Sequence, residues 1–211
     1  MLDLARVRQE YMREGLNEAD ISPDPFVQFE QWFADATKAD LPMPNAMSLT
    51  TVSREHKPSS RLVLLKGVDQ GGFVFYTNYH SRKGHDIEHN AYASLLFGWL
   101  QLERQVRIEG KLFKVSATEA DVYFDTRPLG SRHAAIASPQ SEVIASRAAL
   151  IQRYDDTART SGDTPVRPAH WGGYRLIPDE IEFWQGRENR LHDRLLYRKS
   201  ASGWKVERLA P

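Results

Sequence analysis

Residues 46–78 of this 211-residue chain read AMSLTTVSREHKPSSRLVLLKGVDQGGFVFYTN. Within this stretch the hydrophobic pattern repeats every second residue, and branched and aromatic side chains are frequent, which is typical of β-strands. We predict strands over residues 47–53, 59–68 and 73–78, separated by turn-forming residues at 54–58 and 69–72. The stretch therefore favours an antiparallel sheet or barrel.

The first forty residues have instead the pattern of a helix. Asp24 is a suitable N-cap, and Pro25 suits the first helical position. The apolar side chains that follow recur at steps of three and four residues: Phe26, Phe29, Trp32, Phe33 and Ala36. This spacing predicts a helix that packs one face on a core, and a helical extension is also expected over residues 1–23.

Later in the chain, helices interrupt the strands without alternating regularly with them. Helices are predicted over residues 81–90, 116–126 and 146–160. Further strands are predicted over residues 92–99, 102–115, 173–177, 180–185, 190–199 and 204–209. No internal repeat or linker is visible, so we expect a single α+β domain over residues 1–211, an antiparallel sheet with peripheral helices. The glycine motifs of dinucleotide and P-loop sites are absent.

The composition restricts the possible functions. Lys plus Arg and Asp plus Glu each number 28, so the formal charge is zero, which disfavours nucleic-acid binding. The chain has no cysteine, which excludes disulfides, thiolate catalysis and iron–sulfur clusters. No apolar stretch approaches the roughly 20 residues that span a bilayer, and the first fifteen residues are too charged for a signal peptide. We therefore expect a soluble cytoplasmic protein without nucleic-acid or membrane partners.

Two basic clusters in the first half could bind anions. Arg61 and Lys66 bracket four aliphatic residues, and on a regular strand they would face opposite sides unless a bulge intervenes. The second cluster, Ser81-Arg82-Lys83, places two cations at a helix N-terminus, where a bound anion would balance them. For both clusters, simple solvent exposure is the alternative.

Two further clusters lie in the second half. Tyr123, Arg127 and Ser131 would suit a phosphate monoester, although Arg127 could instead cap the end of its helix.

The fourth cluster is residues 190–194, RLHDR, in which a strand would place Arg190, His192 and Arg194 on one face. Two arginines would lower the pKa of His192, so that a neutral imidazole could act as a hydrogen-bond partner or base. An exposed strand edge is the alternative. A ligand that carries phosphate and a flat heteroaromatic ring would satisfy all four clusters. Two phosphate-like sites suggest either two such ligands or one dinucleotide.

In this order and spacing, the motifs resemble the pyridoxine/pyridoxamine 5′-phosphate oxidase family. The resemblance runs from about Asp24 to the C-terminus and rests on residues 61–66, 75–78, 81–83, 103–106, 126–128, 140–141, 182–186 and 190–194. It implies a split β-barrel, completed by residues 171–211, and a homodimer with FMN at the subunit interface. The implied reaction is oxidation of pyridoxamine 5′-phosphate and pyridoxine 5′-phosphate by oxygen to pyridoxal 5′-phosphate, with release of hydrogen peroxide, and of ammonia from the amine.

The resemblance also implies roles for individual residues. FMN would be bound by Arg61, Leu62, Val63, Leu64, Leu65, Lys66, Tyr76, Thr77, Arg82, Lys83, Gln105, Gln140, Ser141, Trp184 and Arg194. The substrate phosphate would be bound by Lys66, Tyr123, Arg127 and Ser131. Arg190 and His192 would orient the pyridine ring as catalytic residues, and no metal is implied.

One segment departs from the family pattern, residues 132–139, RHAAIASP. Three alternatives stay open. A sister oxidase of the same fold, such as the phenazine-pathway flavoproteins, would act on another ring. A flavin- or pyridoxal-phosphate-binding protein would lack catalysis, and a purely structural barrel would bind no ligand.

Overall fold

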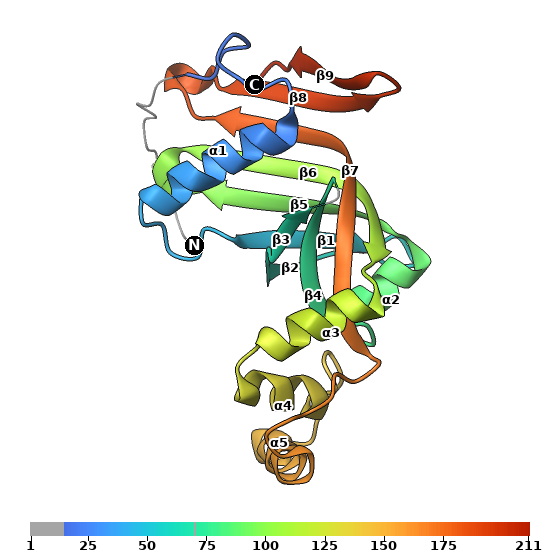
Figure 1. The fold of residues 1–211 in the computed structure, drawn as a ribbon. Helices are drawn as coiled ribbons and strands as arrows, with labels where there is room; N and C mark the ends of the chain where they lie inside the picture. The colour runs from blue at the N-terminus through green and yellow to red at the C-terminus, as the bar shows by residue number, and fades with distance from the viewer. Residues whose placement is uncertain (1–14, 70) are drawn as a thin grey trace, which may run out of the picture. The chain divides into compact units, whose positions relative to one another are not determined.

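The computed structural model describes residues 15–69 and 71–211 (Figure 1). The helices of this part are α1 (Pro25–Lys38), α2 (Arg82–His89), α3 (Ala117–Thr126), α4 (Leu129–Ala137) and α5 (Arg147–Ser161), with short 3₁₀ helices η1 (Leu100–Leu102) and η2 (Glu188–Arg190). The strands are β1 (Ala46–Val52), β2 (Pro58–Leu64), β3 (Gly67–Asp69), β4 (Gly72–Asn78), β5 (Tyr92–Trp99), β6 (Arg104–Lys114), β7 (Trp171–Gln185), β8 (Asp193–Ser200) and β9 (Gly203–Arg208). Within the described ranges, no helix is long and apolar enough to cross a membrane.

The strands in the described part of the chain form one nine-stranded sheet. Its hydrogen-bonded order is β2-β1-β5-β6-β7-β4-β3, and β8 pairs with both β7 and β9. The pairs β3–β4, β4–β7, β7–β8 and β8–β9 are all antiparallel. Because β7 is 15 residues long, it pairs with β4 over residues 171–176 and with β8 over residues 180–185. The predicted antiparallel sheet with peripheral helices is confirmed.

Contacts divide the chain into two compact units. The first consists of residues 1–48, 94–110 and 178–211, and the second of residues 49–93 and 111–177. The single domain over residues 1–211 therefore stays a prediction.

The first unit is organised by α1, which begins as predicted. The Asp24 carboxylate accepts the Phe26 N–H, and Pro25 occupies the first turn. Phe29, Trp32 and Ala36 are buried, and the Trp32 ring meets Phe183 edge-to-face at 5.2 Å. The apolar stripe therefore packs on the sheet of its own unit.

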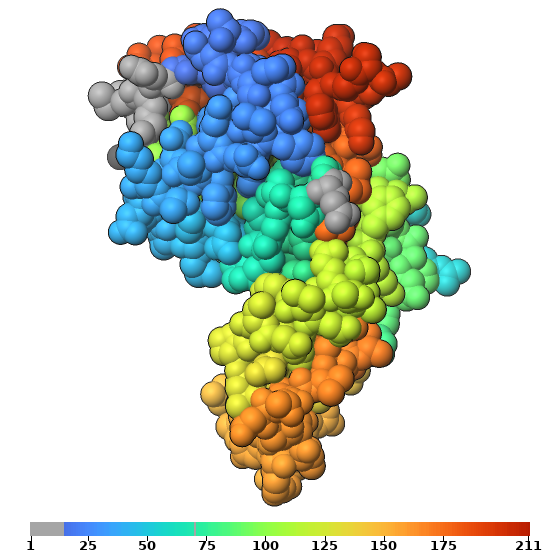
Figure 2. Space-filling model, in the orientation of Figure 1, coloured from blue at the N-terminus to red at the C-terminus, as the bar shows by residue number. Residues whose placement is uncertain are grey.

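In the second unit, polar caps fix the starts of the helices around β4. Ser81 caps α2, Ser116 caps α3 and Ser146 caps α5, and these helices lie within the ranges predicted for them. The start of α2 also approaches the preceding backbone closely, since a Cβ at Gly84 would collide with the carbonyl group of Tyr79. Helix α5 has no buried residue, and its side chains lie on the surface drawn in orange in Figure 2.

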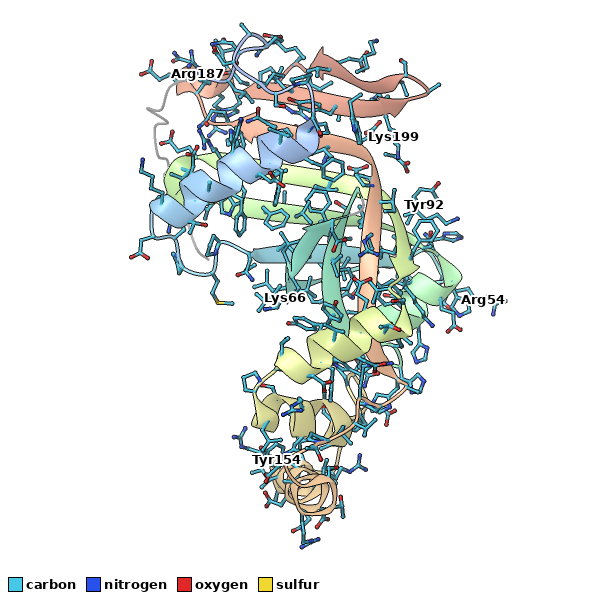
Figure 3. The ribbon with its side chains drawn as sticks, in the orientation of Figure 1. Arg54, Lys66, Tyr92, Tyr154, Arg187 and Lys199 are labelled. Atoms are coloured by element: carbon cyan, nitrogen blue, oxygen red, sulfur yellow. The ribbon has the colours of Figure 1, made fainter. Side chains whose placement is uncertain are left out.

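Two sequence predictions are wrong, and one helix is absent from the predictions, in ways that affect the site. The predicted strand over residues 59–68 is interrupted at Leu65 and Lys66, between β2 and β3 (Figure 3). The predicted strand over residues 190–199 begins only at Asp193, because Asn189 and Arg190 have left-handed φ values of 55° and 62°. Helix α4 was not predicted; it has no side-chain cap, and His133 is its one buried residue.

Two smaller expectations also change. Residues 173–177 and 180–185 belong to one strand, β7, although Pro178 lies between them. Pro178 falls after the segment paired with β4 and before the segment paired with β8, so its missing N–H interrupts neither of these two ladders. Residues 15–24 form turns instead of a helix, while residues 1–14 of the expected helical extension lie outside the described part.

Candidate functional site

A cavity of about 680 Å³ in the second unit collects most of the predicted phosphate-binding residues. We call it the cationic pocket. Its lining residues are Arg61, Leu62, Val63, Leu64, Lys66, Tyr76, Thr77, Lys83, Tyr123, Thr126, Arg127, Pro128, Ser131, Gln140 and Trp171. Four of these side chains are basic and none is acidic, as far as residues 15–69 and 71–211 are concerned. A pocket of this charge is suited to anions.

Arg61 and Lys66 both line this pocket, although a regular strand would point them to opposite sides. The interruption between β2 and β3 explains the difference. Strand β2 ends at Leu64, and the Lys66 N–H then donates to the carbonyl oxygen of Val74 at 2.8 Å. The local change in direction allows two cations five positions apart to serve one ligand.

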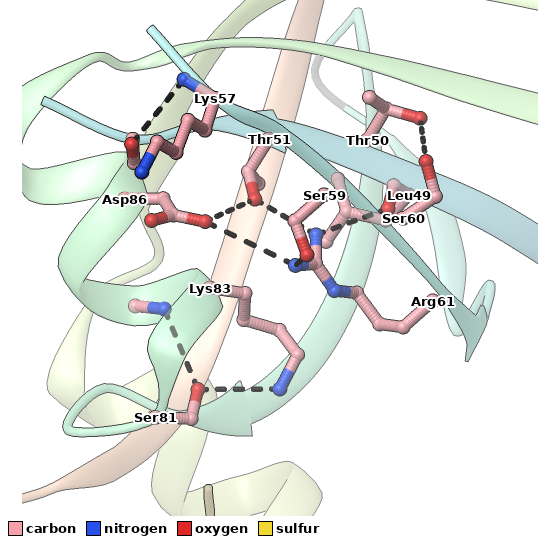
Figure 4. Close-up of polar contacts among 12 residues, drawn as sticks. Leu49, Thr50, Thr51, Lys57, Ser59, Ser60, Arg61, Ser81, Lys83 and Asp86 are labelled. Carbon is pink, nitrogen blue, oxygen red and sulfur yellow. Dashed lines mark hydrogen bonds and ion pairs between the residues drawn. The ribbon is translucent and has the colours of Figure 1, made fainter. Parts of the chain in front are cut away.

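Arg61 is held by a network of neutral oxygens and one more distant carboxylate (Figure 4). Its Nη1 donates to Thr51 Oγ1 at 2.8 Å and to the Leu49 carbonyl at 3.1 Å, and its Nη2 donates to Ser59 Oγ at 2.9 Å. Asp86 Oδ2 lies 3.9 Å from Nη2 and accepts a hydrogen bond from Thr51 at 2.7 Å. Burial lowers the pKa of Arg61, and the Asp86 charge opposes this shift.

Lys83 is a buried cation whose partners in the described part of the chain are neutral. Lys83 lies in the first turn of α2, two residues after the cap Ser81. Its Nζ donates to Ser81 Oγ at 3.2 Å and to Gln140 Oε1 at 2.8 Å. The residue is only 8% exposed, and no carboxylate in the described part of the chain pairs with it. Burial, with a smaller effect from Arg61, lowers its pKa to about 8. An anion entering the pocket would reverse this shift.

Arg127 is a second cation that has no carboxylate partner in the ranges 15–69 and 71–211. It follows the last turn of α3, where Pro128 prevents the helix from continuing. Its guanidinium carbon lies 4.5 Å from the centre of the Trp171 ring, and its buried Nη1 has no hydrogen-bond partner among the described residues. Beside it, the rings of Tyr76 and Tyr123 stack at 3.8 Å. Burial lowers the pKa of Arg127, so this group also favours an anion.

A smaller cavity, of about 250 Å³, lies in the first unit and is called the C-terminal pocket. Its lining residues are Leu96, Gln105, Arg107, Glu182, Trp184, Arg194 and Pro211. Glu182 is buried and accepts hydrogen bonds from Arg107 at 2.6 Å and from Arg194 at 2.6 and 3.2 Å. These contacts raise the pKa of Arg194. Because its basic groups are paired, this pocket is better suited to a polar aromatic ring than to phosphate.

His192 lies just before β8, with its ring 4.6 Å from that of Trp184. Its Nδ1 lies 3.1 Å from the backbone N–H of Arg187 and accepts that hydrogen bond, which assigns the remaining ring proton of the neutral form to Nε2. Burial, then Arg190, lowers its pKa, while Asp193 opposes the shift. The predicted direction is confirmed, but burial is a larger cause than the expected pair of arginines.

Some predicted residues lie elsewhere. Leu65 is buried, Arg82 is exposed, and Ser141 is exposed with a left-handed φ of 77°; within the described ranges none of the three lines the cationic pocket. Arg190 is exposed and, like His192, lines neither described pocket.

Sequence reasoning missed the roles of Glu182, Asp86 and Trp171. The signal for Glu182 was its position two residues before Trp184 on the same strand, because Trp184 pairs with Arg194 on β8. No local pattern distinguishes Trp171 or Asp86, since their partners lie far along the chain.

Comparison with solved structures defines the class of protein. PhzG from Burkholderia lata, in complex with tetrahydrophenazine-1-carboxylic acid, matches with a TM-score of 0.87 and 31% identity over 93% of this chain and 98% of that chain. A pyridoxamine 5′-phosphate oxidase-related FMN-binding protein from Nostoc punctiforme has a TM-score of 0.72 at 18% identity over 90% of this chain and all of that chain. The chain therefore belongs to the class of split-barrel proteins.

Sequence comparison identifies the family within this class. The profile of the pyridoxamine 5′-phosphate oxidase family matches residues 33–159, and that of the pyridoxine 5′-phosphate oxidase C-terminal dimerisation region matches residues 171–211. Pyridoxine/pyridoxamine 5′-phosphate oxidases of Burkholderia cenocepacia and Burkholderia vietnamiensis are 58% identical over 214 residues, covering all of both chains. The chain belongs to the pyridoxamine 5′-phosphate oxidase family and is an oxidoreductase.

Proposed function

We propose that this chain uses FMN and oxygen to oxidise pyridoxamine 5′-phosphate and pyridoxine 5′-phosphate to pyridoxal 5′-phosphate. The observation that carries the proposal is the cationic pocket, in which the buried Lys83 and the half-buried Arg127 have no carboxylate partner among the described residues. Phosphate oxygens would accept the unused hydrogen bonds and balance the charge. The relatives that are 58% identical over the whole chain bear the name of this activity.

The residues present fit two phosphate-bearing ligands. On one side, Arg61 and Lys83 would hold the FMN phosphate, with Gln140 beside it; on the other, Lys66 and Arg127 would hold the substrate phosphate together with Tyr123 and Ser131. In the C-terminal pocket, Gln105, Trp184 and Arg194 offer an aromatic face and hydrogen-bond donors to a flavin ring.

The proposed FMN site lies at the interface of a homodimer. The match of residues 171–211 to a dimerisation region supports this arrangement. Those residues include Trp184 and Arg194 of the C-terminal pocket, so the same segment would serve subunit association and flavin binding.

When bound, FMN would supply the redox chemistry, as acceptor of a hydride from the substrate carbon attached to the pyridine ring and as donor of the two electrons that reduce oxygen to hydrogen peroxide. The alcohol loses its hydroxyl proton and becomes the aldehyde, whereas the amine becomes an imine that water hydrolyses to aldehyde and ammonia. The chain contributes orientation. Its phosphate-binding cations restrict the motion of the substrate, which lowers the entropy lost in reaching the reactive geometry.

His192 would act on the pyridine ring as a hydrogen-bond donor. Because its Nδ1 already accepts the Arg187 N–H, the neutral ring presents Nε2–H to the phenolic oxygen of the substrate. The geometry therefore favours a donor over the general base that the sequence left open. Arg190 would cover the ring.

A purified sample tests the proposal directly. We expect a yellow protein that, in air, converts pyridoxamine 5′-phosphate and pyridoxine 5′-phosphate to pyridoxal 5′-phosphate with equimolar hydrogen peroxide. Bound FMN without aldehyde or peroxide would instead indicate a non-catalytic binding protein. A colourless protein that takes up no FMN would exclude both flavin functions.

The sister-oxidase alternative makes a different prediction in the same assay. It requires turnover of a reduced phenazine carboxylate while both phosphorylated pyridines remain unchanged. The cationic pocket favours the phosphorylated pyridines, since four basic side chains exceed what one carboxylate needs.

The pH dependence should report the state of His192. As the pH falls through the lowered pKa of His192, protonation of Nδ1 breaks the hydrogen bond from Arg187, so kcat/KM should decrease on the acid side. We expect His192→Ala to lower kcat/KM about tenfold and to remove this acid limb. Exposed His56, replaced by alanine, is the matched control. Unchanged turnover and affinity in both His192→Ala and Arg190→Ala would contradict their role.

A further inference from the structure

The half-buried guanidinium of Arg127 rests on aromatic rings and not on carboxylates. Its central carbon lies 4.5 Å from the Trp171 ring centre and 5.8 Å from that of Phe124. By contrast, Arg175 in the same unit donates to Asp69 at 2.6 Å and to Glu119 at 2.9 Å. In the part of the chain that the structure describes, Arg127 forms no such ion pair, and its buried Nη1 is unpaired. Its charge is therefore not neutralised by a carboxylate of the described residues.

Trp171 is itself firmly held. It is 6% exposed, and it pairs with Asn78 at the start of β7. Its carbonyl oxygen accepts a hydrogen bond from Arg167 Nη1 at 2.6 Å, and Arg167 Nε donates to Asp121 of α3, also at 2.6 Å. The indole meets Phe124 of α3 edge-to-face at 5.2 Å. The same helix thus carries Arg127 at its end and braces the ring beneath it.

We infer that Trp171 is a positioning residue, which fixes the Arg127 guanidinium for the substrate phosphate without neutralising it. The inference rests on the proposed function, since it takes the phosphate as the ligand of Arg127. A carboxylate would also orient the guanidinium, but it would compete with phosphate for the same N–H groups. An indole attracts the cation through its π face and leaves the N–H groups at the edge of the guanidinium available.

Two substitutions separate this role from simple filling of space. Trp171→Leu removes the π face, whereas Trp171→Phe keeps a smaller ring. The measurement is the dissociation constant of the FMN-loaded protein for pyridoxal 5′-phosphate and for pyridoxal, whose ratio gives the preference for phosphate. We expect Trp171→Leu to reduce this preference by about 10- to 30-fold and Trp171→Phe by about threefold, because the attraction is largest at a desolvated indole. Pyridoxal binding should stay within about twofold of wild type.

Steady-state kinetics supplies a second measurement. Because the interaction is present in both the bound substrate and the transition state, KM for pyridoxamine 5′-phosphate should rise while kcat is nearly unchanged. Trp204→Leu is the matched control: Trp204 belongs to β9 in the first unit, where it contacts Phe26, and this variant should keep the wild-type preference.

The outcomes are distinguishable. A wild-type protein without preference for the phosphorylated ligand overturns the inference and the proposed function together. A wild-type preference that is retained in both Trp171 variants overturns the inference alone, as does an equal loss of pyridoxal and pyridoxal 5′-phosphate binding. FMN content and a thermal melt show whether each variant is folded, and if Trp171→Leu is not, Trp171→Phe carries the test.

Discussion

Replacing Lys83 by methionine is expected to weaken FMN binding by about 10- to 100-fold and to make the FMN-free protein more stable. The two effects have one cause. The Lys83 ammonium is 8% exposed, and its hydrogen bonds go to Ser81 Oγ and Gln140 Oε1, which carry no charge. Methionine retains most of the apolar stem and removes the buried charge. The FMN phosphate, however, loses a charged donor.

The pH dependence of this prediction follows from the lowered pKa. In the folded protein the pKa of Lys83 is about 8, against an ordinary value of 10.5. Below pH 8 Lys83 is protonated in both the folded and the unfolded chain, so the cost of burying its charge is fully present. Between pH 8 and 10.5 the unfolded chain binds more protons, and this group makes the free energy of unfolding rise with pH. FMN affinity should change in the opposite direction and fall above pH 8, because the phosphate binds the protonated ammonium.

Flavin fluorescence titration and urea unfolding of the FMN-free protein measure the two effects at pH 7 and pH 9. Lys57→Met is the matched control, since Lys57 is an exposed lysine in the turn between β1 and β2. An unchanged FMN affinity in Lys83→Met would contradict the assignment of Lys83 to the phosphate. Destabilisation of the FMN-free variant would contradict the view that the empty pocket holds an unbalanced cation.

Local patterns in the sequence predict the elements well where one side chain decides the start of a helix. Asp24, Ser81, Ser116 and Ser146 all cap helices, because a hydroxyl or carboxylate satisfies backbone N–H groups only a few residues ahead. Helix α4 lacks such a cap and was missed, although its alanines favour helix. The interruption at Leu65 and Lys66 depends on pairing with β4, which periodicity alone does not reveal.

The candidate site shows a similar division. Lys83 enters the cationic pocket while its neighbour Arg82 stays exposed, because successive residues on a helix point about 100° apart. The sequence identifies Arg127 as an anion-binding candidate, but the Trp171 ring beneath it comes from a distant strand. Arg190 was expected to be part of an extended strand, but the structure shows that its backbone is left-handed.

The largest effect on substrate binding is expected from Arg127→Ala, which should raise KM for pyridoxamine 5′-phosphate by about 100-fold or more. A guanidinium can donate two parallel hydrogen bonds to a phosphate, and in this pocket it has no carboxylate among the described residues to share them with. Arg127→Lys keeps the charge but loses the fork, so its KM should lie between those of wild type and alanine, about tenfold above wild type.

The same change should leave the folded protein nearly as stable, and this combination separates ligand binding from structure. In the FMN-free, substrate-free protein the half-buried guanidinium lacks a full set of partners among the described residues. Its removal therefore costs the protein mainly the contacts with Trp171 and Phe124. Arg54→Ala, at an exposed arginine labelled in Figure 3, is the control and should change neither quantity. If Arg127→Ala raised KM equally for phosphorylated and unphosphorylated pyridines, Arg127 would act on the ring, and the phosphate would belong to other cations of the pocket.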